Sequence, residues 1–421
     1  MSTISDKPNN SNKRRVVVTG IGALSPLGHD WATVRAQLHS GKNMIRVMQE
    51  WKDIEGLNTQ LGCTVLPFDL PAHYNRKTMR SMGRVALMGT RASEMALENA
   101  GLLGDPLVKS GKMGVAYGSS AGTPAAIGDF GRMIAEKTTE GINANTYIKM
   151  MSHTAAVNIG VFLGLTGRVI TTSSACTSGS QGIGYAFEAI QTGKQVAMLA
   201  GGAEELDATQ AAVFDTLFAT SVKNDAPGLT PRPFDAARDG LVLGEGACTF
   251  VLEELEHAKA RSANIIAELI GFGTNCDGTH VTHPNSATMA QAMLLAIEDA
   301  GIAASDIGYV NAHGTSTEQG DIAESQATHQ VFGDRVPVST LKGFMGHTLG
   351  ACGALEAWMT LEMMHDGLFA QNANLTQVDE RCAAIDYIVD QPRAVNTDVV
   401  MSNNFAFGGI NTSLIFKRWK A

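Results

Sequence analysis

Cys176 is the residue of this sequence best placed to act as a nucleophile. It stands in the run SSACTSGSQGIGYAFEAI, where small residues crowd it on both sides, between a predicted strand over 169–172 and a predicted helix over 182–191. The side chain would therefore project from a tight turn at a helix N-terminus, where free N–H groups suit an oxyanion. Those N–H groups and the helix dipole predict a lowered pKa for this thiol. A small buried structural cysteine is the competing interpretation, which we keep for the other five cysteines.

Two histidines and a lysine follow in the second half of the sequence. His313 lies in NAHGTSTEQGD, and Lys342 and His347 lie in STLKGFMGHTLGACGALE. Each histidine is flanked by glycines at a predicted strand-to-helix junction, which packing alone explains poorly. Thr315 and Thr317 suit a phosphate-bearing or amide-rich arm, although capping threonines beside a turn histidine would look the same. A nucleophilic thiol and two imidazoles are enough for covalent acyl catalysis.

Alternating strands and helices must position these residues. The first half contains a helix over 84–100 between short strands, with a strand over 112–117 and another over 196–200, and the second half repeats the alternation from a strand over 265–271. This pattern favours an α/β layered fold with two units in tandem. The expected divisions are a polar tail over 1–15, an N-terminal unit over 16–262 and a C-terminal unit over 263–421.

Composition limits the class of protein. The 421 residues are 44% hydrophobic and 17% charged, which is typical of a well-buried globular chain. A net charge of −9 argues against nucleic acid as the main partner. The six cysteines form no CxxC pair, which argues against a zinc site or a disulfide framework and fits a reducing cytoplasm. We also expect no secretory signal in the first 15 residues and no contact with a membrane.

Four motifs in this order resemble those of the β-ketoacyl-[acyl-carrier-protein] synthases. They are ACTSG at Cys176, NAHGTST at His313, LKGFMGHTLGA at His347 and FGG at Phe407, and the likeness runs from VVVTGIGALSPLG to NTSLIF. His347 indicates the elongating Cys-His-His branch, because the starter-condensing branch carries Asn there. The resemblance implies the thiolase fold, an α/β architecture of two duplicated halves in five layers (α-β-α-β-α). The implied reaction is decarboxylative condensation of an enzyme-bound acyl group with malonyl-acyl-carrier protein, as in fatty acid chain elongation.

The resemblance also implies a role for each residue of the site. Cys176 would hold the acyl chain, and its N–H group would form the oxyanion hole together with that of Phe407. His313 and His347 would hydrogen-bond the malonyl thioester carbonyl and stabilise the enolate that forms on loss of CO₂.

Further residues would support the site or bind the substrate. Lys342 would orient the His313 loop through an ion pair with Glu324. The remaining positions are a gate at Phe407, Gly408 and Gly409, contacts to the phosphopantetheine arm at Thr282, Thr315 and Thr317, structural support at Glu356, an acyl-pocket position at Ala121, and carrier-protein docking at Arg76, Lys77, Arg80 and Arg84.

The resemblance implies partners rather than a resident cofactor. The phosphopantetheine arm would arrive on acyl-carrier protein, and no metal is implied. A homodimer is expected, with a heterodimer containing a chain-length-factor-like subunit as the alternative.

Several positions depart from the usual pattern of this family. Ala406 and Ile410 stand where Gly and Thr are usual, so we expect a stiffer gate, because alanine takes a positive φ at a cost. Ala121 stands where housekeeping elongators carry a larger aliphatic residue, and 143–152 lacks the usual aromatic-Pro pattern. These differences leave a specialised ketosynthase of a polyene- or polyketide-type secondary pathway, with or without a partner subunit, as an alternative to fatty acid elongation.

Two other classes of protein were weighed against a condensing enzyme. A thiolase-like enzyme acting on coenzyme A esters would need a second catalytic cysteine near the C-terminus, and SNNFAFGGIN contains none. A non-catalytic partner subunit would not need the nucleophile, whereas Cys176, His313, Lys342 and His347 are all present here.

Overall fold

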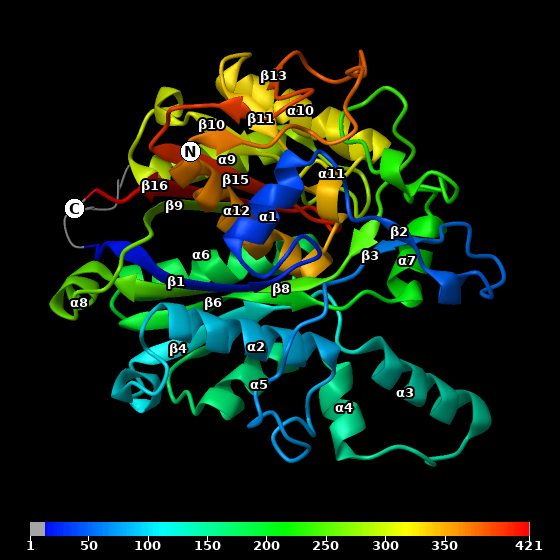
Figure 1. Ribbon diagram of the computed structural model, residues 1–421, viewed down its shortest axis with the longest axis vertical. Helices are drawn as coiled ribbons and strands as arrows, with labels where there is room; N and C mark the ends of the chain where they lie inside the picture. The colour runs from blue at the N-terminus through cyan, green and yellow to red at the C-terminus, as the bar shows by residue number, and fades with distance from the viewer. Residues whose placement is uncertain (1–12, 421) are drawn as a thin grey trace, which may run out of the picture.

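A computed structural model describes residues 13–420, and most of its elements belong to two units of the same topology (Figure 1). The predicted polar tail over 1–15 falls mainly on residues 1–12, which lie outside the described residues. The N-terminal unit consists of β1 (Val16–Leu24), α2 (Arg84–Asn99), β4 (Met113–Gly118), α5 (Thr154–Leu163), β5 (Val169–Thr171), α6 (Ser178–Gln191), β6 (Ala197–Glu204) and β8 (Gly246–Glu254).

The C-terminal unit repeats this order of strands and helices. It consists of β9 (Ala267–Cys276), α9 (Ser286–Ala300), β10 (Tyr309–Asn311), α10 (Glu318–Phe332), β11 (Pro337–Ser339), α12 (Cys352–Asp366), β15 (Val399–Phe405) and β16 (Ile410–Arg418). The strands run β5-β4-β6-β8-β1 in one unit and β11-β10-β15-β16-β9 in the other, so each unit orders its strands 3-2-4-5-1. Each pair of neighbouring strands in the N-terminal unit has the same relative direction, parallel or antiparallel, as the matching pair in the C-terminal unit.

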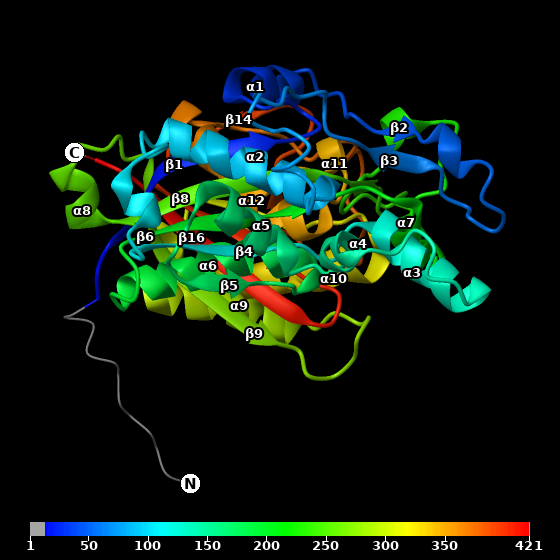
Figure 2. The same ribbon diagram turned by 90° about the horizontal axis from the view of Figure 1, so that it is seen from below.

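The two sets of strands are joined, and helices fill the space between and outside them. β1 pairs with β9 at Val16–Val18, which makes one eleven-stranded sheet with β13 (Asp386–Tyr387) at its end. Helices α2 and α5 cover the outer face of one half, α9 and α10 cover that of the other, and α6 packs against α12 in the middle (Figures 1 and 2). The predicted five-layer α-β-α-β-α arrangement is therefore confirmed.

Close packing of glycines repeats along with the topology. Gly20 and Gly22 of β1 face the alanine-rich surface of α2, and Gly271 and Gly273 of β9 face that of α9. A Cβ atom added to any of the four would lie 2.1 to 2.4 Å from a helix carbonyl oxygen, so only glycine lets each helix approach its strand this closely. This G-x-G repeat is a short trace of duplication that the sequence analysis missed.

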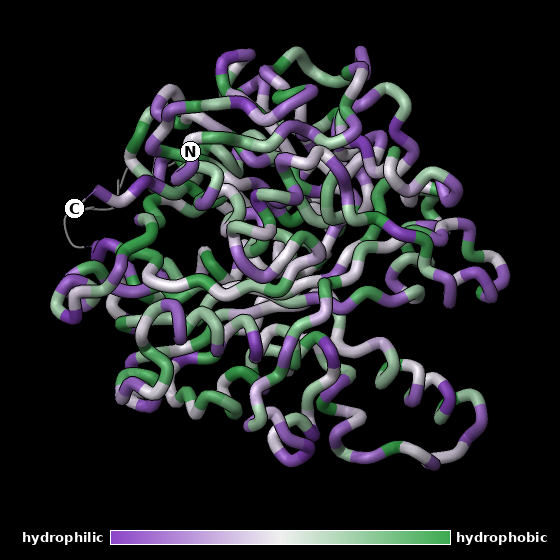
Figure 3. Tube along the Cα trace, in the orientation of Figure 1, coloured by the Kyte–Doolittle hydropathy of each residue, from purple (hydrophilic) through white to green (hydrophobic). Residues whose placement is uncertain are grey.

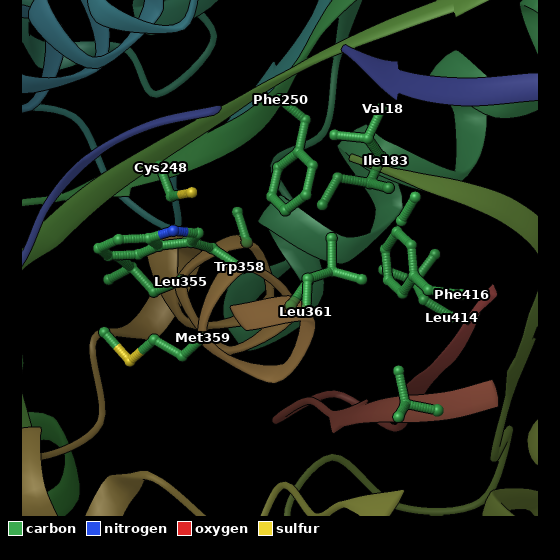
Figure 4. Packing of buried hydrophobic residues seen from close by; sticks show 14 of the residues in the cluster. Val18, Ile183, Cys248, Phe250, Leu355, Trp358, Met359, Leu361, Leu414 and Phe416 are labelled. Atoms are coloured by element: carbon green, nitrogen blue, oxygen red, sulfur yellow. The ribbon is translucent and has the colours of Figure 1, made fainter. Parts of the chain in front are cut away.

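The core is centred on the middle helices. Leu355, Trp358 and Leu361 of α12 pack against Phe250 of β8 and Ile183 of α6 (Figure 4). Helix α12 is buried on almost every side, as expected for a helix between two sheets. The apolar segments gather along the central strands and helices, while the periphery is more polar (Figure 3).

Shorter elements extend from this framework. Helices α3 and α4 project from the body at the lower right of Figure 1, and the sequence analysis did not predict them. Within residues 13–420, no helix combines the length and apolar character needed to cross a bilayer. The additional elements are α1 (Trp31–His39), α3 (Pro124–Glu136), α4 (Ala144–Met150), α7 (Ala208–Asp215), α8 (Leu255–Ala260), α11 (Lys342–Met345), β2 (Arg46–Val47), β3 (Leu61–Cys63), β7 (Leu243–Gly244), β12 (Leu368–Phe369) and β14 (Arg393–Ala394).

Candidate active site

Cys176 lies in a tight turn between β5 and α6. Ala175 has φ of 50°, a left-handed conformation that is uncommon for a residue with a side chain, and a short 3₁₀ turn runs through 175–177. Helix α6 then begins at Ser178, four residues before the predicted start at Gly182. The nucleophile therefore stands directly at the end of this helix, as the pattern of small residues predicted.

The structure brings Cys176 together with both histidines. The Sγ atom of Cys176 lies 2.9 Å from Nε2 of His347, and the rings of His313 and His347 stand edge to face with their centroids 5.1 Å apart. Burial, and then the positive charge of Lys342, holds the pKa of each histidine well below its usual range. The imidazoles are therefore neutral and can donate an N–H to a carbonyl oxygen or accept a proton from a thiol.

The predicted lowering of the pKa of Cys176 is wrong. Burial raises this pKa to about 11, and that effect outweighs the backbone N–H of Phe407, the charge of Lys342 and the N–H of Cys176 itself, all of which favour the thiolate. The sequence indicates the helix terminus but not the depth of the site, and desolvation acts against the charged form. A thiol in this state needs a nearby base, and His347 is in hydrogen-bonding contact with it.

The predicted ion pair between Lys342 and Glu324 is also wrong. Lys342, on α11, instead forms a fully buried ion pair with Glu356 of α12. Burial alone would lower the pKa of Lys342, but the Glu356 carboxylate raises it above its ordinary value. Glu324 acts on the loop directly, because its two oxygens accept the backbone N–H groups of His313 and Gly314, each at 2.6 Å.

Asn404 is a site residue that the sequence analysis missed. Its Nδ2 atom donates to Oε2 of Glu356 at 2.9 Å and lies 3.5 Å from Nδ1 of His313. This amide therefore connects the buried ion pair to the imidazole. Its signal in the sequence is a pair of asparagines, Asn403 and Asn404, on a strand just before the glycine turn.

A cavity of about 470 Å³ opens on Cys176, His313 and His347. Thr282, Thr315 and Thr317, the residues expected to contact the substrate arm, all line it, and the hydroxyls of Thr315 and Thr317 lie 2.9 Å apart. Phe407 and Gly409 of the expected gate also line it. These positions give the cavity a polar lining from the threonines and an aromatic side chain at Phe407, whose ring centroid lies 5.8 Å from that of Phe214.

The expected strain at Ala406 is not found. The backbone takes positive φ at Gly408 (93°) and Gly409 (76°), while Ala406 is not among the described residues with positive φ. The N–H of Ala406 instead donates to the carbonyl of Ile410 at 2.7 Å, which closes the turn. The glycines therefore take the conformations that alanine would resist.

Some predicted residues lie away from this cavity. Ala121 does not line it, and the backbone N–H of Ala121 faces the buried carboxylate of Glu204 at 3.3 Å. The expected docking segment does not line it either. Its members are Arg76, Lys77 and Arg80, which are exposed, and Arg84, whose Nε donates to Glu245 at 2.9 Å.

The same side chains could also hold a metal ion. The potential ligand atoms of Cys176, His313 and His347 all lie within 4.8 Å of one another, and those of His313, Cys352 and Glu356 do so as well. All of these residues are buried, and each set mixes thiol, imidazole or carboxylate donors. This density of nucleophilic and acid-base groups is what covalent acyl transfer requires.

Comparisons with known proteins agree with this chemistry. The family model for the beta-ketoacyl synthase N-terminal domain matches residues 13–258, and that for the C-terminal domain matches residues 266–376. The chain is 39% identical to 3-oxoacyl-[acyl-carrier-protein] synthase 2 of Vibrio cholerae, over 97% of this chain and all of that protein.

Solved structures extend the likeness to the whole fold. A beta-ketoacyl synthase from Burkholderia phymatum STM815 is 57% identical with a TM-score of 0.95, over 97% of this chain and all of that one. The ishigamide ketosynthase/chain length factor is 29% identical with a TM-score of 0.87 over the same shares. The chain belongs to the beta-ketoacyl synthase family, and it is an acyltransferase that elongates acyl chains by Claisen condensation.

Proposed function

We propose that this enzyme condenses a fatty acyl group held on Cys176 with malonyl-acyl-carrier protein, which yields 3-oxoacyl-acyl-carrier protein and CO₂. The observation that carries the proposal is the 2.9 Å contact between Sγ of Cys176 and Nε2 of His347, with His313 beside them. No resident cofactor takes part, since the phosphopantetheine arm arrives with the carrier protein.

The first step loads the enzyme. Sγ of Cys176 attacks the thioester carbonyl of the acyl-carrier substrate, and its proton passes through His347 to the departing phosphopantetheine thiol. The N–H groups of Cys176 and Phe407, which already stabilise negative charge on the sulfur, are placed to stabilise the tetrahedral oxyanion. Burial of the site makes each of these hydrogen bonds stronger than it would be in water.

The second step forms the carbon–carbon bond. The neutral imidazoles of His313 and His347 donate N–H hydrogen bonds to the malonyl thioester oxygen, so the bond to the carboxylate breaks, CO₂ leaves and the enolate is stabilised. The enolate carbon then attacks the acyl carbonyl and releases Cys176, which takes up one proton from solvent. Burial, and after it the fixed positive charge of Lys342 paired with Glu356, keeps both imidazoles neutral.

We also propose acyl-carrier protein as the partner and a homodimer as the assembly. The basic segment around Lys77 and Arg80 suits an acidic carrier protein. β5 lies at the edge of the sheet with Val169 48% exposed, and an exposed edge strand of this kind is a template for pairing with a second copy. A heterodimer with a chain-length-factor-like subunit would use the same edge. The six free cysteines support a reducing, cytoplasmic setting.

A specialised polyene-type synthase is the second candidate. It is favoured by the likeness to the ishigamide ketosynthase/chain length factor and to the ketosynthase of a type II PKS. The two candidates share the reaction and differ in the acyl chain. Products formed from a panel of saturated and polyunsaturated acyl-carrier thioesters separate them.

The variant Cys176→Ala tests the assigned reaction. Alanine fits the small site, so the fold should survive while acyl transfer and condensation are lost. Malonyl decarboxylation should continue, because that step uses the histidines. Normal condensation by this variant would overturn the proposed function.

A further inference from the structure

The mouth of the catalytic cavity carries an apolar rim that the proposed chemistry does not use. We define the apolar rim as Leu217, Phe218 and Val281, which line the cavity and are 46%, 89% and 63% exposed. Leu217 and Phe218 follow α7, and Val281 lies in the loop before α9. Val213, four residues before Leu217, is also half exposed. Exposed apolar side chains gathered at one opening indicate a binding surface.

Phe218 is the most informative member of the apolar rim. Its φ is 54°, a left-handed conformation that is a genuine outlier for a bulky side chain and strains the backbone. Because the ring is 89% exposed, it contributes almost no burial in return. A strained backbone that holds an aromatic ring in solvent does not serve the stability of this chain, and such strain is typical of functional sites.

The turn that carries Phe218 is held rigidly. Asp215, at the end of α7, is 4% exposed, and its carboxylate accepts hydrogen bonds from both the N–H and the side-chain amide of Asn58, each at 2.9 Å. It also accepts from the N–H of Thr59 at 3.1 Å and from the hydroxyl of Thr220 at 2.9 Å. The backbone of the turn is therefore anchored, which lowers the backbone entropy lost on binding.

Cations beside the mouth are neutralised within the chain. Arg238, which lines the cavity, is 2% exposed and lies 2.6 Å from Asp379. Lys223, after the Phe218 turn, lies 3.2 Å from Asp239. A partner that binds around the opening would therefore meet apolar side chains rather than unpaired positive charge at Arg238 and Lys223.

We propose that the apolar rim is a docking contact for the protein part of the acyl-carrier substrate. This inference rests on the proposed function, because a thioester delivered to Cys176 on a tethered arm brings its carrier to the cavity mouth. The basic segment around Lys77 and Arg80 borders a different hollow, which shares no lining residue with the catalytic cavity. The apolar rim is therefore separate from the basic segment, and the two contacts can be tested independently.

The variant Phe218→Asn tests this contact. Asparagine tolerates positive φ, so the turn is kept while the apolar ring is removed. We expect kcat/KM for a hexanoyl-loaded acyl-carrier protein to fall about tenfold, as for the loss of a central aromatic contact. We expect kcat/KM for the small thioester hexanoyl-N-acetylcysteamine to change little. The loss should be equal in about 50 mM and about 500 mM salt, because apolar contacts are not screened. Leu294→Gln, which changes an exposed leucine of α9, should affect neither substrate.

Each other outcome overturns the inference in a different way. An equal loss with both substrates would mean that Phe218 shapes the cavity, and no loss with either would mean that the ring is not a contact. A loss that disappears at high salt would indicate an electrostatic contact. Dissociation of an oligomer by Phe218→Asn, seen by analytical ultracentrifugation, would assign the apolar rim to an interface between copies. Failure of the unmodified enzyme on every carrier substrate would overturn the proposed function, and the docking contact with it.

Discussion

Replacing Lys342 with Met should destabilise the fold as well as abolish activity. Lys342 and Glu356 are 1% and 0% exposed, so the substitution leaves a carboxylate buried without its counter-charge. Removing one partner of such a pair lowers the free energy of unfolding by about 3–5 kcal/mol, whereas replacing both charges often leaves it unchanged. We therefore expect Lys342→Met and Glu356→Gln each to lower the free energy of unfolding by about 3 kcal/mol or more. The double variant should recover most of that loss.

Equilibrium urea unfolding, followed by tryptophan fluorescence, measures this double-mutant cycle. The matched control is Lys259→Met, which breaks the exposed pair with Glu256 and should cost less than about 1 kcal/mol. The double variant should remain inactive, since it removes the positive charge that, after burial, holds the pKa of both histidines low. A double variant as unstable as the single ones would refute the reasoning, and so would a Lys342→Met variant as stable as the unmodified enzyme.

Three further predictions concern catalysis and the substrate. His313→Ala should slow malonyl decarboxylation by about 10² or more with acylation less affected, because it removes a preorganised donor to the enolate oxygen. His347→Ala should slow both steps, because His347 also takes the proton of Cys176; acylation that is unchanged in His347→Ala but lost in His313→Ala would exchange the assigned roles. Arg80→Glu should weaken use of carrier-bound substrates but spare small thioesters, and the loss should shrink at high salt; equal losses would make the segment structural. Ala121→Ile should leave the distribution of acyl products unchanged, because Ala121 does not line the cavity that opens on Cys176; a shift to shorter products would extend the acyl tunnel to Ala121.

The sequence predicts the framework well where periodicity and turn residues agree. The helix predicted over 84–100 is α2, which ends at Asn99, because its apolar spacing and the glycine after it point to the same limits. The start of α6 was missed, because a 3₁₀ turn and a run of small polar residues precede it. Helices α3 and α4 were also missed, since they project from the body and bury few side chains of their own.

Partners within the site could not be predicted from spacing. Glu324 and Glu356 both lie on helices that follow catalytic residues, and only the packing of α12 against the central strands decides which carboxylate meets Lys342. The state of Cys176 depends in the same way on depth of burial, which no local pattern records. The order of the motifs predicts which residues meet, while their ionisation follows from tertiary structure.

Covalent loading of Cys176 is the claim on which the mechanism depends. Mass spectrometry of the enzyme mixed with hexanoyl-acyl-carrier protein alone tests it directly. We expect one hexanoyl group on the peptide that contains Cys176, and its disappearance on addition of malonyl-acyl-carrier protein as 3-oxooctanoyl product forms. A hexanoyl group on any other residue, or product formation with no acylated enzyme at any time point, would contradict covalent catalysis by this cysteine.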